Sequence, residues 1–130
     1  MASLTFPAKW AAFFAAQAAL AIAAGAFGAH ALNGLVDERA LGWWHTGSQY
    51  LMYHSLAGLL VAALSSYLSF HKAILSFFFV GNVLFAGSLY VMTLTGQTWL
   101  GVVTPLGGIC YLLGWLLLVI CLWRAKGYKE

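Results

Sequence analysis

Apolar side chains fill four long segments of the chain, and none of the four contains Asp, Glu, Lys or Arg. The segments are Trp10–Ala31, Ser48–Leu68, Ala73–Leu94 and Val102–Trp123. An apolar helix of about 20 residues, rising about 1.5 Å per residue, crosses the hydrocarbon core of a bilayer, which is about 30 Å thick. The pattern therefore predicts four transmembrane helices.

Short polar connections separate these segments, which favours helices that alternate in direction. The longest connection, 32–47, is partly apolar and carries Trp43 and Trp44. We therefore expect a short interfacial helix there that runs into the second span, with Asp37 as its N-cap. The predicted fold is all-α: an integral membrane antiparallel four-helix bundle in which residues 1–130 form a single transmembrane domain.

The composition agrees with a membrane protein, because 63% of the residues are hydrophobic and only 7% are charged. The net charge of +3 comes from six basic and three acidic residues that do not cluster on one helical face. A nucleic-acid partner is therefore not expected.

Basic residues fall almost entirely on one side of the predicted bundle. Five of them share that side, namely Lys9, Lys72, Arg124, Lys126 and Lys129, and Arg39 is on the other. Because Lys and Arg are enriched in cytoplasmic segments, we expect both termini in the cytoplasm. An alternative reading of the first segment is a signal peptide ending at Ala29-His30-Ala31, but its apolar run exceeds the usual 7–15 residues.

Small residues recur along the predicted helices at spacings that allow two backbones to approach closely. The expected packing positions are Gly25, Gly28, Gly58, Gly81, Ser88, Gly107 and Gly114. Cys110 and Cys121 lie about 16 Å apart along one predicted helix, too far for a disulfide, so we expect packing roles for both.

Polar side chains gather in the non-cytoplasmic half of the predicted bundle. The candidates for a ligand site or for interhelical hydrogen bonds are His30, His45, Gln49, Tyr50, His54 and Asn82. Hydrogen bonds between helices are the simplest interpretation, whereas a quinone, a lipid or haem near His54, Tyr50 and His30 is an alternative. No metal site, cofactor or catalytic motif is expected, since the histidines lack Cys or carboxylate partners at ligand spacing.

Four blocks of the sequence resemble one family of small membrane proteins. The blocks are GAFGAHAL at 25–32, TGSQYLMYHSLAGLL at 46–60, LFAGSLYVMTLTG at 84–96 and TPLGGICYLLGW at 104–115. They are similar to the YgdD and transmembrane protein 256 family, a domain of unknown function. The resemblance implies a four-helix protein of the bacterial inner membrane or of an organelle, and it implies no catalytic residues.

Three hypotheses about function follow from these observations. The first is a non-enzymatic accessory subunit that packs against a partner membrane protein or forms a homo-oligomer. The second is a bundle that binds a small ligand, and the third is an oligomeric channel or permease. The absence of charged residues within the spans disfavours an ion-coupled transporter acting as a monomer.

Overall fold

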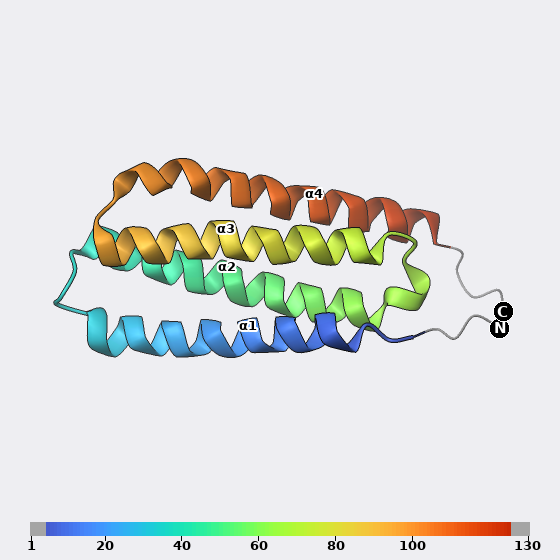
Figure 1. Cartoon of the computed structure of the whole chain (residues 1–130), viewed down its shortest axis with the longest axis horizontal. Coiled ribbons are helices and arrows are strands. Elements are labelled where there is room, and N and C mark those ends of the chain that lie inside the picture. The colour runs from blue at the N-terminus through green and yellow to red at the C-terminus, as the bar shows by residue number, and fades with distance from the viewer. Residues whose placement is uncertain (1–4, 126–130) are drawn as a thin grey trace.

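The computed structural model describes residues 5–125 and shows four long helices and no β-strand in that range. The helices are α1 (Ala8–Phe27), α2 (Glu38–Ala63), α3 (His71–Thr95) and α4 (Val103–Arg124). Three short helical segments accompany them: the π-helical η1 (Gly28–Leu32) and the 3₁₀ segments η2 (Ser65–Tyr67) and η3 (Thr98–Val102). The chain turns back at each connection, so consecutive helices lie side by side (Figure 1). The all-helical prediction is confirmed.

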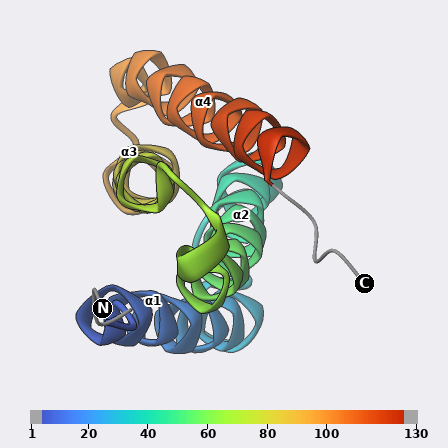
Figure 2. The ribbon, with the colours of Figure 1, turned by 90° about the vertical axis from the view of Figure 1, so that its right-hand side faces the viewer.

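The middle of the molecule is the pair formed by α2 and α3. Helix α1 packs on α2 and helix α4 packs on α3, which leaves α1 and α4 on opposite sides of the central pair (Figure 2). α2 is therefore covered by neighbours along much of its surface, whereas α1 and α4 each present a broad outward face. This position explains why α2 can carry several polar side chains.

Within the described residues, three segments are long and apolar enough to cross a membrane: Ala8–Leu32, His71–Thr95 and Thr98–Arg124. Their helical bounds lie close to three of the four spans expected from the sequence. α2 is not among them because it is less hydrophobic: Ser48, Gln49, His54 and Ser55 interrupt its apolar residues. Its crossing of the membrane stays a prediction.

The main apolar core lies at the end of the bundle where α1 begins and α2 ends. Phe14, Val61, Ile74 and Phe78 meet there and are fully buried. The Phe14 ring lies against Gly58, where a Cβ would come within 2.6 Å of a ring carbon. The missing side chain of Gly58 therefore makes the space that Phe14 fills.

The start of α2 lies where the sequence predicted a capped helix. The Asp37 side chain accepts a hydrogen bond from the Ala40 backbone N–H at 2.7 Å, so the predicted N-cap is confirmed. The helix then runs without a break from Glu38 to Ala63. The interfacial position of its first turns stays a prediction. Contacts of its first turns with α1 and α3 keep this stretch in line with the rest of α2.

Helices α3 and α4 approach most closely at glycine. A Cβ on Gly107 would lie 2.5 Å from the Phe85 backbone nitrogen, and one on Gly81 would lie 2.6 Å from the Tyr111 ring. Gly114 faces Phe78 in the same way. Gly25, in contrast, has no atom within 4 Å of its Cβ position, so the expectation that it lies at a close helix contact is wrong.

Candidate functional site

His54 is held by hydrogen bonds at both of its ring nitrogens. It lies on α2 and is 5% exposed. Its Nε2 lies 3.0 Å from Nε1 of Trp115 on α4, and its Nδ1 lies 2.8 Å from the Tyr50 backbone oxygen. An indole N–H only donates, so Nε2 is the acceptor and the ring proton sits on Nδ1, which donates to Tyr50. Neither nitrogen is left to bind a metal or a haem iron.

The flat faces of His54 are also occupied. The Tyr111 ring stacks on it with a centroid separation of 3.5 Å and an interplanar angle of 11°. Phe78 of α3 meets it edge-on at 5.5 Å. His54 is therefore enclosed by side chains of α3 and α4, which fixes the rotation of α2 relative to both.

Asn82 forms a second buried junction. It is 2% exposed on α3, and its Nδ2 donates to Gln17 Oε1 of α1 at 2.9 Å. Its Oδ1 accepts from the Tyr111 hydroxyl of α4 at 2.7 Å. Tyr111 thus joins the two junctions, since its ring stacks on His54 and its hydroxyl bonds to Asn82. We call this set the central polar cluster: Gln17, His54, Asn82, Tyr111 and Trp115. It connects all four helices.

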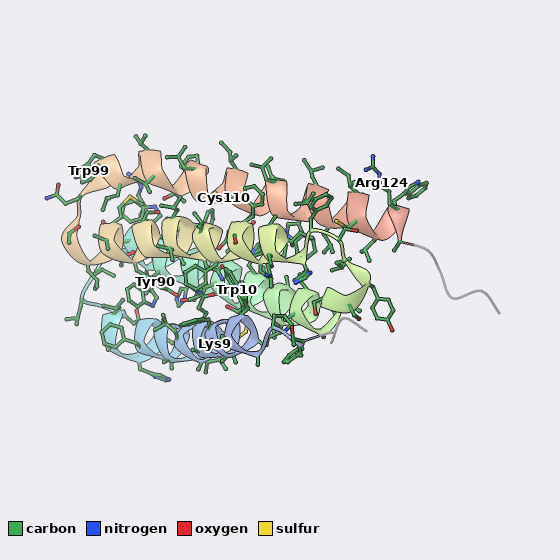
Figure 3. All side chains as sticks on the ribbon, turned by 45° about the vertical axis from the view of Figure 1, so that its right-hand side comes forward. Lys9, Trp10, Tyr90, Trp99, Cys110 and Arg124 are labelled. Atoms are coloured by element: carbon green, nitrogen blue, oxygen red, sulfur yellow. The ribbon has the colours of Figure 1, made fainter. Side chains whose placement is uncertain are left out.

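A second group of contacts lies at the end of the bundle where η1 meets α2. Trp44 Nε1 donates to the Ala24 backbone oxygen of α1 at 2.6 Å, and its ring lies 4.4 Å from that of Tyr90. Tyr90 bonds in turn to Ser48 at 2.9 Å. We call Trp44, Ser48 and Tyr90 the Trp44 cluster; Tyr90 is labelled in Figure 3.

Gly28 of the GAFGAHAL block makes room for the Trp44 indole. A Cβ at Gly28 would lie 2.8 Å from Trp44 Nε1, which is too close for real side chains. The indole N–H reaches Ala24 of the same helix from this position. The block therefore contributes a docking place for an aromatic ring, and its histidine is not part of that contact.

The other predicted polar residues lie on the outside. His30, His45 and Gln49 are exposed, and their side chains make no hydrogen bond within residues 5–125. Tyr50 is 39% exposed, and its ring packs 4.8 Å from that of Phe85 at the edge of the central polar cluster. The structure thus brings His54 near Tyr50 and does not bring either of them to His30.

Several contributors were not identified from the sequence: Trp44, Tyr90, Tyr111 and Trp115. Tyr111 and Trp115 are four residues apart on α4, a spacing that places both on one helical face. This spacing could have identified them as two side chains of one packed face. The hydrogen bond between Tyr111 and Asn82, which lie on different helices, could not be predicted without the fold.

The buried polar side chains are paired with one another or with the backbone. Within residues 5–125, no buried side-chain nitrogen or oxygen lacks a hydrogen-bond partner, and no three His, Cys, Asp or Glu side chains gather as a metal site. Ser88 and Thr104 add a further bond between α3 and the start of α4 at 2.6 Å. The polar side chains mainly tie helices together.

Long apolar helices joined by buried polar bonds define a small helical membrane protein. The chain belongs to the DUF423 family, described as a protein of unknown function, whose profile matches residues 24–108. The narrower names YgdD and transmembrane protein 256 stay a prediction.

Relatives from several bacteria cover most of this chain. It is 43% identical over 109 residues to the UPF0382 membrane protein YwdK of Bacillus subtilis, covering 82% of this chain and 89% of that protein. It is 36% identical over 107 residues to a UPF0382 membrane protein of Haemophilus influenzae, covering 81% and 86%. No solved structure matches the chain.

Proposed function

We propose that this chain is a non-enzymatic protein of the bacterial cytoplasmic membrane that acts as an accessory or interaction subunit. One observation carries the proposal: the buried polar side chains of residues 5–125 all have hydrogen-bond partners, and the central polar cluster connects α1, α2, α3 and α4. A catalytic or transport site needs polar groups that face a substrate. Here such groups mainly stabilise the bundle, and we propose no catalytic role for them.

The proposed arrangement is an antiparallel four-helix bundle that crosses the membrane with both termini in the cytoplasm. Lys9, Lys72 and Arg124 lie at the start of α1, the start of α3 and the end of α4, which meet at one end of the bundle (Figure 1). Arg39 lies at the start of α2, at the opposite end. This asymmetry supports the proposed orientation. Lys126 and Lys129 lie outside the described residues.

A second copy of this chain is the proposed partner, and the outward face of α1 is the proposed contact. Small residues line that face at alternating spacings of four and three, and all of them are exposed: Ala12, Ala16, Ala19, Ala23 and Ala26. Such spacing suits two parallel helices in lipid, because small side chains let their backbones approach closely. A face of this kind is complementary to itself, as a twofold dimer requires.

Cysteine cross-linking in membranes tests this contact. In a background with Cys110 and Cys121 replaced by Ala, the Ala19→Cys variant should form a disulfide-linked dimer on mild oxidation. Leu112→Cys is the matched control, because Leu112 is 63% exposed near the middle of α4. We expect several-fold more dimer from Ala19→Cys. Equal dimer yields, together with a monomer in nanodiscs that brings no other protein through purification, would overturn the proposal.

A further inference from the structure

A hollow lies between α1 and α3, on the side where the two helices are not in close contact. Its volume is about 180 Å³, and it is open on one side. Residues lining it include Gln17, Leu20, Leu51, Asn82, Gly87 and Tyr90. Leu51 of α2 is buried and lies behind the two outer helices. The hollow is mostly apolar, with amide groups in its wall.

Gln17 brings an unused hydrogen-bond donor to this hollow. Its carboxamide oxygen accepts from Asn82, which leaves the amide nitrogen with two N–H groups for which residues 5–125 provide no acceptor. The Tyr90 hydroxyl, in contrast, is already bonded to Ser48. Gln17 therefore offers two free N–H groups to the hollow, whereas Asn82 keeps only one, on a side chain that is 2% exposed.

The depth of Gln17 restricts what can supply the acceptor. It is nine residues beyond Ala8, the first residue of α1, which corresponds to about 13 Å along the helix axis. In a hydrocarbon core about 30 Å thick, that position is near the midplane, where water is absent and an unpaired amide is costly. Phospholipid ester groups lie at the edge of the core and do not match this depth. The acceptor must belong to a lipophilic molecule.

The size of the hollow points to a ring. An engineered protein cavity of about 150 Å³ binds benzene, so a hollow of this size accommodates one six-membered ring with small substituents. We propose that the α1–α3 hollow binds the ring of a lipophilic carbonyl compound of the quinone class, with the Gln17 amide nitrogen donating to a ring carbonyl oxygen. The apolar tail of such a compound extends from the open side of the hollow into the lipid.

This site is distinct from a ligand site at His54, whose two ring nitrogens are engaged. It is also distinct from the Ala-lined face of α1 that we propose for self-association. Binding in the hollow and dimerisation are therefore separable in experiment, and either proposal can fail without the other.

The test uses the full chain in nanodiscs without quinone, with decylubiquinone as the probe and thermal stability as the readout. A ligand that binds the folded state raises Tm with increasing concentration. We expect a saturable rise with decylubiquinone and a much smaller one with decylbenzene, which has the same tail but no carbonyl. Gln17→Leu should weaken binding by about fivefold, the contribution of one hydrogen bond.

Two glycine variants keep the test independent of the Gln17–Asn82 bond. Gly87→Leu places a side chain where no atom lies within 4 Å, which fills the hollow without disturbing the bundle. Gly108→Leu is the control, because its Cβ position on α4 is equally open and it does not line the hollow. Gly87→Leu should abolish the rise in Tm and Gly108→Leu should retain it. Equal responses of these two variants, or equal responses to both probes, would overturn the proposal.

Discussion

At the scale of single residues, one donor-only group determines the state of the central histidine. Because the Trp115 indole donates to His54 Nε2, the imidazole is neutral and its proton is on Nδ1. A histidine within an apolar segment is a natural candidate for a cofactor ligand. Here His54 joins α2 to α4 through its hydrogen bond with Trp115.

The two histidines of α2 should differ sharply in their contribution to stability. His54→Leu removes the acceptor of Trp115 and the ring that stacks on Tyr111, so we expect it to lower the free energy of unfolding in detergent by about 1–3 kcal/mol. His45→Leu, at an exposed position, should change it by no more than about 0.5 kcal/mol. Equal unfolding midpoints for the two variants would contradict the role assigned to His54.

The sequence could indicate which residues are polar and deep, but it could not pair them. His54 and Asn82 were identified from their positions within apolar segments, and both are buried in hydrogen bonds. His30, His45 and Gln49 were named beside them, although they lie nearer the ends of the expected spans, and they proved to be exposed. The difference depends on the rotation of each helix about its axis, and packing against the other helices sets that rotation.

At the scale of helices, the GAFGAHAL block acts through its glycine. Gly28 lets the Trp44 indole lie against the end of α1 and donate to Ala24. Directly at this point α1 gives way to the π-helical η1. The contact between Gly28 and the Trp44 indole, which lie far apart in the sequence, thus determines how α1 and α2 pack.

Gly28→Ala should therefore destabilise the bundle, and Gly25→Ala should not. The new methyl group at Gly28 would overlap the Trp44 ring and displace its hydrogen bond, at a cost of about 1–3 kcal/mol. At Gly25 the Cβ position is open, so the same change should be neutral or stabilising by up to about 1 kcal/mol, through better helix propensity. Chemical unfolding in detergent, together with the emission maximum of tryptophan fluorescence, measures both effects. A loss of stability of the same size at both glycines would show that Trp44 is not the cause.

Helix boundaries were predictable where apolar runs are uninterrupted. The runs 10–31, 73–94 and 102–123 correspond closely to segments α1–η1, α3 and α4. α2 begins at Glu38 and ends at Ala63, whereas the expected span was about 48–68 and the residues before it were expected in an interfacial helix that runs into that span. Hydrophobicity marks the part of a helix that suits lipid, whereas the capping group Asp37 and the contacts of Trp44 decide where this helix begins.

At the scale of the whole molecule, the position of α2 reconciles its composition with a membrane. α2 lies between α1 and α3, and its inward polar groups Ser48, His54 and Ser55 are each hydrogen-bonded. A helix enclosed by protein tolerates polar groups that would be costly against lipid. Low hydropathy in α2 is therefore compatible with crossing, and the crossing itself can be measured.

Labelling on the two sides of α2 tests the topology directly. In a background without native cysteines, Leu35→Cys and Tyr67→Cys place thiols before and after α2, at residues that are 78% and 70% exposed. The positive-inside bias puts Tyr67 in the cytoplasm and Leu35 on the other side. A membrane-impermeant maleimide added to spheroplasts should label Leu35→Cys, and it should label Tyr67→Cys only after the membrane is opened. The reverse pattern would invert the proposed orientation, whereas labelling of both thiols in intact spheroplasts would show that α2 does not cross, because both of its ends would then lie on one side.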